Sequence, residues 1–304
     1  MNKKKYLIAE LAGGLGNQLF IFFAAEYFSK ITGRDLILDC SHVDFNHSKF
    51  DICSLNISNR VTRKRQTKLN KFFKRVKDFI NYRFKFVYFL LFREQIIGDE
   101  IILETSKILT LKCKRIRLRG FFHNFEYFEK VKTDVLKKII DYDKTYRCTD
   151  YFQKLESSDK YTIGIHVRRG DYLATPETLG NLDSKYYVEI LQEIEKSHAC
   201  SKALLFIFTD DLKYCEDLVL NSSYSGKVIY RVSKKEEDPM HDLILMSNLD
   251  LLYISNSTFA IVAGLICAGQ VIAPSPIRKK QRPHENFDVN FPTSWKVLPA
   301  RWTL

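Results

Sequence analysis

The feature that most constrains this chain is an apolar strand that ends abruptly in charge. Residues 162–167 read Thr-Ile-Gly-Ile-His-Val, and Arg168, Arg169, Gly170 and Asp171 follow directly. Such a run is typical of a strand buried in a parallel sheet, and open α/β sheets bind ligands at the carboxyl ends of their strands. Two adjacent guanidinium groups there predict a phosphate or carboxylate ligand, which a guanidinium grips with paired hydrogen bonds. The competing interpretation is a surface cluster in which Arg169 and Asp171 merely pair.

Composition allows two domains of ordinary size. The chain has 304 residues, of which 45% are hydrophobic, enough for two buried cores. No apolar run reaches the roughly 18 residues of a transmembrane helix, and Glu10 interrupts the apolar N-terminal stretch too early for a secretory signal. The cysteines, seven in all, form no CxxC pair, which is typical of reduced thiols in a cytosolic protein. Because HExxH is also absent, we expect no metal site.

Strand-like and helix-like segments alternate along the chain. The expected strands cover residues 5–11, 35–39, one or two stretches within 96–118, then 161–167, 203–208, 227–232, 251–254 and, as the last, 271–273. Amphipathic stretches between them, such as residues 17–32 and 184–197, predict helices. This rhythm predicts an α/β fold with two doubly wound Rossmann-like domains. The polar stretch 141–160 marks the boundary, so we place the domains at 1–155 and 156–304.

A glycine-rich turn follows the first expected strand, at Gly13–Gln18. Small residues there let the backbone approach a ligand, and the next helix presents its free N–H groups. Gly14 and Gly16 match the first two glycines of a dinucleotide-binding fingerprint, but Leu19 stands where the third belongs. A tight turn without a ligand is the equally supported alternative.

Polar residues also end two other expected strands. Asp210 and Asp211 follow one of them and serve either a ligand or the next helix, with Thr209 or Asp210 as its N-cap. Residues 255–258 read Ser-Asn-Ser-Thr before another helix, which suits phosphate oxygens or simple capping. Since all these motifs share the carboxyl edge of a sheet, together they predict a phosphate-bearing ligand held by arginines.

The motifs, taken in order, resemble those of the α-1,2-fucosyltransferases of bacterial surface-glycan clusters and of blood-group H synthesis. The resemblance runs from residue 7 to about residue 298 and rests on Gly13–Gln18, His166–Tyr172, Phe208–Asp211, Asp242–Ser247, Ser255–Phe259 and Pro292–Trp295. It implies a GT-B fold, in which two Rossmann-like domains flank a cleft. It also implies GDP-fucose as the donor and no divalent metal or other cofactor.

The resemblance implies a role for each motif. Arg168 binds the β-phosphate of the departing GDP, where a fixed guanidinium stabilises charge that develops in the transition state. Asn17 orients the acceptor or the sugar near the reacting centre. Asp171 is either the base that receives the acceptor's proton or a partner of arginine, and we prefer the second. The remaining donor contacts are assigned to Gly14, Gly16, His166, Arg169, Asp210, Asp242, Asn256, Ser257 and Thr258.

The implied reaction is transfer with inversion, from β-linked GDP-fucose to an α-1,2 linkage on a galactoside. The acceptor is an oligosaccharide or lipid-linked glycan of O-antigen or capsule synthesis, which places the enzyme in the cytoplasm or at the cytoplasmic face of the inner membrane. Residues 156–304 hold the donor and residues 1–155 mostly the acceptor. One departure is the run 260–263, Ala-Ile-Val-Ala, where family members carry two tryptophans. Either this change repacks the core, or it alters how the donor is placed.

The segment 60–93 carries most of the net charge of +12, with twelve lysines and arginines against one acidic residue, Asp78. Phenylalanines recur among the cations at helical spacing, so we expect a helix over residues 68–91. Three interpretations stay open: a solvated insertion, adhesion to an anionic membrane, or nucleic-acid binding, which no recognisable module supports. For the whole chain, the rivals are a related enzyme with another donor or linkage and a non-catalytic nucleotide- or nucleic-acid-binding protein.

Overall fold

The computed structural model describes residues 4–41, 52, 60–62, 68–99, 108–146, 150–174, 177, 180–197, 203–233, 238–279 and 291–303. It divides into two compact units, Met1–Lys138 and Ile139–Leu304. The division falls inside helix α5 (Phe125–Tyr146), earlier than the boundary between residues 155 and 156 that we predicted. Because one continuous helix crosses the division, no polar linker marks this boundary in the sequence.

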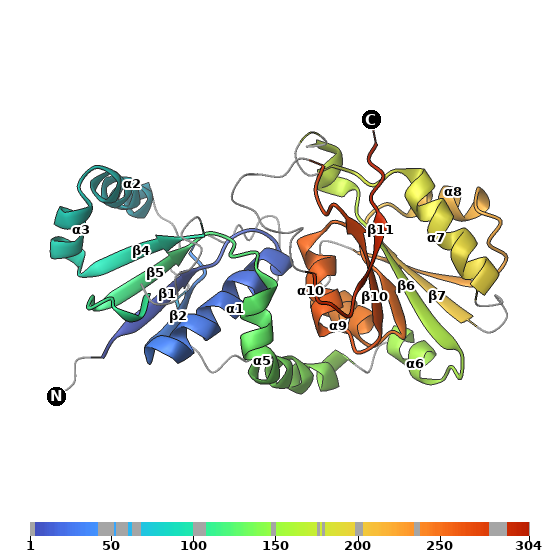
Figure 1. The fold of residues 1–304 in the computed structure, drawn as a ribbon, viewed down its shortest axis with the longest axis horizontal. Coiled ribbons are helices and arrows are strands. Elements are labelled where there is room, and N and C mark those ends of the chain that lie inside the picture. The colour runs from blue at the N-terminus through green and yellow to red at the C-terminus, as the bar shows by residue number, and fades with distance from the viewer. Residues whose placement is uncertain are drawn as a thin grey trace. The chain divides into compact units, whose positions relative to one another are not determined.

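The first unit is built on a five-stranded parallel sheet (Figure 1). The order is β3-β2-β1-β5-β4, with β1 at Tyr6–Glu10, β2 at Asp35–Asp39, β3 at Arg60–Thr62, β4 at Glu94–Gly98 and β5 at Arg115–Arg119. Helix α1 (Leu15–Thr32) packs against β1 and β2, and α5 packs on α1, where the rings of Phe23 and Phe128 are 5.0 Å apart. Helices α2 (Lys68–Arg83) and α3 (Lys85–Phe92) pack against each other, and α3 contacts β4.

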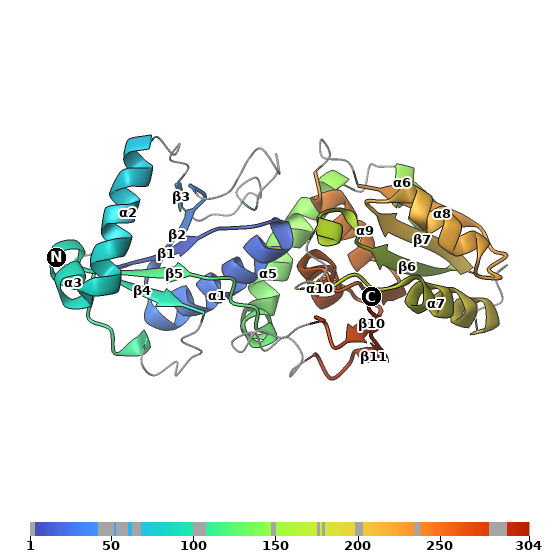
Figure 2. The ribbon, with the colours of Figure 1, turned by 90° about the horizontal axis from the view of Figure 1, so that it is seen from above.

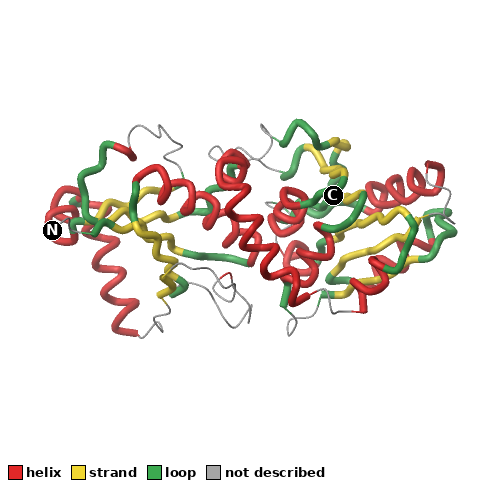
Figure 3. Tube along the Cα trace, turned by 90° about the horizontal axis from the view of Figure 1, so that it is seen from below, coloured by secondary structure: helices red, strands yellow, loops and turns green. Residues whose placement is uncertain are grey.

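The second unit has a six-stranded parallel sheet of order β11-β10-β9-β6-β7-β8, drawn in yellow between red helices in Figure 3. Its strands are β6 at Tyr161–Val167, β7 at Ala203–Thr209, β8 at Val228–Val232, β9 at Leu251–Tyr253, β10 at Gln270–Ser275 and β11 at Lys296–Pro299. The helical elements are α6 at Asp150–Glu156, the 3₁₀ turn η2 at Gly170–Ala174, α7 at Ser184–Ser197, α8 at Leu212–Leu220, α9 at Met240–Ser247 and α10 at Thr258–Ile266.

Strands β6 and β7 form the centre of the second unit and are buried on both faces. Figure 1 shows α7 and α8 on one side of this sheet and α9 and α10 on the other. On the first side Ile165 of β6 shares a buried cluster with Tyr187 of α7. On the second side the rings of His166 and Phe259 of α10 lie 6.1 Å apart. Because both faces are covered, these strands are apolar almost throughout, which is the pattern that predicted them.

Each sheet has one position where the order of its strands reverses. In the first unit β1 lies between β2 and β5, so the reversal falls between β1 and β5. In the second unit β6 lies between β7 and β9, so the reversal falls between β6 and β9. Open α/β sheets bind ligands outside the carboxyl ends of the strands at such switch points. The fold therefore directs attention to the residues that follow these four strands.

Most of the expected elements are confirmed, and four points are corrected. Strand β3, helix α6 and strand β11 were missed, and β11 overturns the expectation that residues 271–273 form the last strand. The side chains of β11 are largely exposed, so that edge strand lacks the apolar run of a central one. The helix expected over 68–91 is two helices that meet at Phe84. Within the described ranges, every helix is too short or too polar to serve as a membrane span.

The expectation of reduced thiols throughout is wrong for Cys40, which follows β2 and is disulfide-bonded. The other described cysteines, Cys113, Cys215 and Cys267, are free thiols. Pairing depends on which segments meet in space, so spacing along the chain did not reveal the bond. The remaining cysteines of the sequence, Cys53, Cys148 and Cys200, lie outside the described residues.

Candidate active site

The switch point between β6 and β9 carries a buried polar pair. Nδ1 of His166, near the end of β6, lies 2.8 Å from Oγ of Ser255, which follows β9. The two residues are only 7% and 0% exposed. The Ser255 oxygen also accepts a hydrogen bond of 3.2 Å from the backbone N–H of Ser257. These contacts tie the end of β6 to the start of α10.

The burial of His166 predicts that the protein loses stability as the pH falls. Burial, assisted by the nearby charge of Arg168, lowers the pKa of His166 from 6.5 to about 3. Between these values the unfolded chain binds more protons than the folded chain, so the contribution of His166 is complete above pH 6.5 and is lost progressively below it. We expect the melting temperature to fall across this range, and less steeply in His166→Asn. Equal slopes in the two proteins would contradict this account.

Arg168 is held by carboxylates from two segments. Its Nη1 lies 2.9 Å from Oδ2 of Asp210, just beyond β7, and its Nη2 donates to Oδ1 of Asp171 at 2.6 Å. The Arg168 side chain remains 33% exposed. The guanidinium is therefore fixed in direction and still accessible to a ligand. The pairing of Asp171 with Arg168 agrees with the interpretation of Asp171 that we preferred.

Arg169 serves the neighbouring helix. Its Nε lies 3.1 Å from Oδ2 of Asp211, and its guanidinium carbon lies 3.7 Å from the ring centroid of Tyr214. Asp211 caps α8 by accepting from the backbone N–H of Tyr214. The alternative in which Thr209 or Asp210 is the cap is therefore wrong. The backbone N–H of Arg169 donates to Oδ1 of Asp210 at 2.9 Å. Arg169 therefore braces Asp210, which in turn holds Arg168.

The N-terminus of α10 lies in the same chain of contacts. Ser257 is its N-cap residue, but the Ser257 side chain makes no capping bond and is hydrogen-bonded to Tyr172. The first N–H groups of the helix are thus left for an anion, and the partly exposed Thr258 stands at the first helical position. Asn256 is different, because it is 6% exposed and donates to the carbonyl of Gly180 at 3.0 Å. Its amide is used to hold a loop.

Asp242 has a structural role in the second unit, and its predicted contact with the donor stays a prediction. The Nε of Arg231, on β8, lies 2.6 Å from Oδ1 of Asp242, and the hydroxyl of Ser233 donates to Oδ2 at 2.8 Å. Asp242 is 3% exposed and Arg231 is 8% exposed. Both carboxylate oxygens are therefore bonded inside the fold. The sequence placed Asp242 on a helix but gave no sign of its buried partner.

The first unit has a polar pair at its own switch point. Oδ1 of Asn17 lies 3.0 Å from Nε2 of His123, which follows β5. The preceding turn requires glycine at Gly13, because its φ is 73° and a Cβ would come 2.6 Å from Nδ2 of Asn17. Gly14 is the extended N-cap of α1, and Gly16 is buried inside that helix. The turn thus explains Gly13, and the predicted ligand contacts of Gly14 and Gly16 stay predictions.

Arg278 is a cation of the second unit that the sequence analysis missed. It follows β10, and its charge opposes the rise that burial causes in the pKa of Tyr172. The guanidinium of Arg168 acts on Tyr172 in the same way and lies 5.8 Å from its ring centroid. The sequence signal that could have revealed Arg278 is a cation shortly after a strand.

Among the described residues, no three His, Cys, Asp or Glu side chains are grouped as metal ligands would be, so we assign none of them to a metal.

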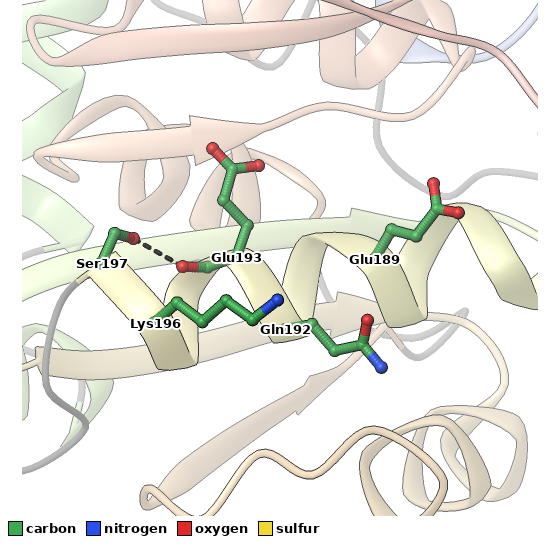
Figure 4. Close-up of a pocket in the computed structure, with 5 residues that line it drawn as sticks. All are labelled: Glu189, Gln192, Glu193, Lys196 and Ser197. Atoms are coloured by element: carbon green, nitrogen blue, oxygen red, sulfur yellow. Dashed lines mark hydrogen bonds between the residues drawn. The ribbon is translucent and has the colours of Figure 1, made fainter.

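Figure 4 shows a concavity on α7 that none of the site residues named above lines. It is lined by Glu189, Gln192, Glu193, Lys196 and Ser197, all from one helix. The hydroxyl of Ser197 donates to the carbonyl of Glu193 at 2.6 Å, and Glu189 forms an ion pair with Arg301 at 2.8 Å. Mostly exposed side chains from one helix do not enclose a substrate. We therefore assign the active site to the strand ends.

Almost the whole chain matches one family of enzymes. The matching family model is described as Glycosyl transferase family 11, and the match covers residues 10–298. The chain belongs to this family. It is therefore a glycosyltransferase, and the family decides against the non-catalytic alternative considered above.

Relatives in this family come from bacteria and mammals. The chain is 27% identical to the O-antigen biosynthesis glycosyltransferase WbnK of Escherichia coli, over 82% of this chain and 86% of the relative. It is 26% identical to an alpha-1,2-colitosyltransferase of Escherichia coli, over 89% and 91% of the two chains. It is 23% identical to the galactoside alpha-(1,2)-fucosyltransferase 2 of Sus scrofa, over 57% of this chain and 54% of the relative.

Solved structures confirm the predicted GT-B fold. A mutant of Arabidopsis thaliana FUT1 in complex with GDP superposes with a TM-score of 0.53 at 15% identity, covering 91% of this chain and 72% of that one. The Escherichia coli ADP-heptose lps heptosyltransferase II gives 0.53 at 11% identity, covering 96% and 90%. These similarities concern the fold alone.

The run 260–263, where the resemblance implies two tryptophans, lies within the core of the second unit. Residues 260–263 lie in α10 and are all 1% exposed or less. A Cβ on the nearby Gly264 would lie 2.9 Å from the ring of Trp295, so that tryptophan packs closely against the same helix.

Proposed function

We propose that this family 11 glycosyltransferase transfers fucose from GDP-fucose to a galactoside, forming an α-1,2 linkage in O-antigen or capsule synthesis. The names of the bacterial and mammalian relatives support the linkage, the sugar and the pathway. The proposal includes action without a divalent metal and a location in the cytoplasm or on the cytoplasmic face of the inner membrane. The acceptor would be an oligosaccharide or a lipid-linked glycan.

The observation that carries the proposal is the arrangement around Arg168. An oriented, partly exposed guanidinium lies at the end of β6, and the N-terminus of α10 follows the neighbouring β9. Both features favour an anion, and both sit at the switch point of the sheet. The phosphates of a sugar nucleotide fit this chemistry.

Arg168 would act when the sugar leaves. The acceptor oxygen attacks C1 of fucose from the face opposite GDP, and the bond between C1 and the β-phosphate oxygen breaks. The electron pair of that bond stays on GDP, whose β-phosphate gains negative charge close to the guanidinium. A positive group fixed before the reaction lowers the energy of this transition state more than that of bound substrate. Asp171 is one candidate to receive the acceptor's proton, although its ion pair with Arg168 is its observed role.

The function is tested by assaying the purified protein with GDP-fucose and a galactoside in the presence of EDTA. We expect α-1,2-fucosylated product at a rate that EDTA does not change, with the linkage read by NMR. A strict requirement for a divalent metal would contradict the metal-free mechanism. Preference for another sugar nucleotide would contradict the donor.

Colitose transfer is the second candidate, because the colitosyltransferase relative matches more of the chain than the mammalian fucosyltransferase does. Colitose is fucose without its 3-hydroxyl group. A direct competition between the two GDP-linked sugars distinguishes fucose transfer from colitose transfer, because the preferred donor is the one with the higher kcat/KM. Loss of a hydrogen bond to the 3-hydroxyl would favour fucose strongly if the site has a polar partner for it.

A further inference from the structure

Helices α2 and α3 carry an exposed apolar surface, which we call the α2–α3 face. Its side chains are between 37% and 81% exposed. They are Phe72, Phe73, Val76, Phe79, Tyr82, Phe84, Phe86, Val87, Phe89, Leu90 and Leu91. Isolated exposed apolar residues are ordinary, but so many on two adjacent helices mark a binding surface. The helices lie at one end of the first unit (Figure 2).

Helix α2 turns its apolar stripe away from its own unit. Phe72, Val76 and Phe79 recur at helical spacing and are 60%, 39% and 61% exposed. The opposite side of the helix contacts the unit, where Oδ1 of Asp78 accepts from Nη1 of Arg119 at 2.8 Å. An amphipathic helix normally buries its apolar stripe, so this orientation requires another partner for the stripe.

Helix α3 fixes this face to the sheet. Tyr88 is 3% exposed and donates to Oε1 of Glu94 at 2.7 Å. The same carboxylate oxygen accepts from Nε of Arg117, on β5, at 3.0 Å. The ammonium of Lys77 lies 4.6 Å from the ring centroid of Phe92, joining the two helices. These contacts hold the exposed phenylalanines and leucines in a defined position, which disfavours a loosely packed insertion.

The charge around the face is almost entirely positive. Exposed cations of the two helices and their flank are Arg75, Lys77, Arg83, Lys85 and Arg93. The segment's acidic residue, Asp78, is already paired with Arg119. Residues 63–67, which add three more cations in the sequence, lie outside the described residues.

The chemistry of the face selects its partner. A second copy of the chain would bring two positive surfaces together, which costs energy. Nucleic acid would be attracted by the cations, and its bases could stack on the aromatic rings of the face, but it offers no apolar phase that would bury Val87, Leu90 and Leu91. A bilayer with anionic lipids satisfies both features, since its acyl region takes the apolar side chains and its phosphates take the cations. We propose that the α2–α3 face docks the enzyme on an anionic membrane surface without crossing it.

The proposal is tested by flotation of the full-length protein with vesicles of phosphatidylcholine, with and without phosphatidylglycerol. We expect binding to the anionic vesicles only. Each cation removed should weaken partitioning about fivefold, so Arg75→Gln, Arg83→Gln and Lys85→Gln together should weaken it roughly a hundredfold. The matched control replaces three exposed lysines of the second unit, Lys196, Lys213 and Lys227, with glutamine and should bind normally.

A second set of variants tests the contribution of the apolar side chains to membrane binding. Phe72→Ser, Phe79→Ser and Phe86→Ser together should abolish flotation, whereas Leu109→Ser, Leu220→Ser and Val297→Ser, at other exposed apolar positions, should not. A tryptophan introduced by Phe79→Trp should shift its emission to the blue on anionic vesicles. Failure of the unmodified protein to float, equal loss in test and control variants, or vesicle-independent dimerisation through the α2–α3 face would each overturn the proposal.

Discussion

Replacing Arg168 with alanine is expected to lower kcat by about 100- to 1,000-fold, the loss typical when one fixed electrostatic contact to the transition state is removed. In the proposed reaction, the new charge on GDP appears where this guanidinium is held by Asp171 and Asp210. The KM for the donor should change less than kcat, because the contact strengthens as the bond breaks. Steady-state kinetics with GDP-fucose measures both parameters.

Two comparisons separate charge from geometry. Arg168→Lys keeps the charge but loses the planar fork that meets two carboxylates, so we expect only partial recovery of kcat. Arg301→Ala removes another arginine of the second unit, whose partner is the exposed Glu189, and should leave kcat unchanged. Thermal unfolding of all three variants checks that the fold survives. Turnover near normal in Arg168→Ala would refute its role.

Replacing Asp242 with alanine is expected to destabilise the protein by about 3–5 kcal/mol, because it removes one member of the buried ion pair that Asp242 forms with Arg231. For a unit of this size the melting temperature should fall by roughly 10 °C. Glu189→Ala, which breaks an exposed ion pair, should cost less than about 1 kcal/mol. Chemical denaturation of both variants provides the comparison.

A double variant distinguishes the structural role from the donor contact that the sequence predicted. Arg231→Met combined with Asp242→Leu removes both charges together and should recover most of the lost stability. If Asp242 acts only through the fold, the recovered protein should also recover its KM for GDP-fucose. A recovered fold with a much weaker KM would instead support a contact between Asp242 and the donor.

The sequence revealed much of the site because the polar residues at the carboxyl edge of a sheet directly follow apolar strands in the chain. A buried strand is apolar throughout, and the residues just after it reach the carboxyl edge whatever the rest of the fold does. His166, Arg168 and Asp210 were found in this way. The pairings were not, since His166 and Ser255 are separated by 89 positions and meet only when β6 and β9 become neighbours.

Other features also depended on which segments meet. Arg231 neutralises Asp242 because β8 and α9 are adjacent in space, and the bond at Cys40 likewise reflects a contact that residue spacing does not encode. Arg278 acts electrostatically on Tyr172, a residue far earlier in the chain. Contacts between residues that are far apart in the sequence produce no periodic pattern in a single chain.

The sequence by itself determined the alternation of strands and helices, the family and the anionic chemistry of one strand end, because periodicity and motifs are local properties. Tertiary structure decided how those parts are used. The stripe of Phe72, Val76 and Phe79 has the same spacing whether it faces a core or solvent. The exposure of these side chains, with the ion pair of Asp78 and Arg119 on the other side of the helix, shows that the stripe faces outward. Likewise, packing decided that Arg168 remains open to a ligand while Asp242 is closed within the fold. A side chain's neighbours set its burial and charge balance, and those neighbours are chosen when distant segments pack together.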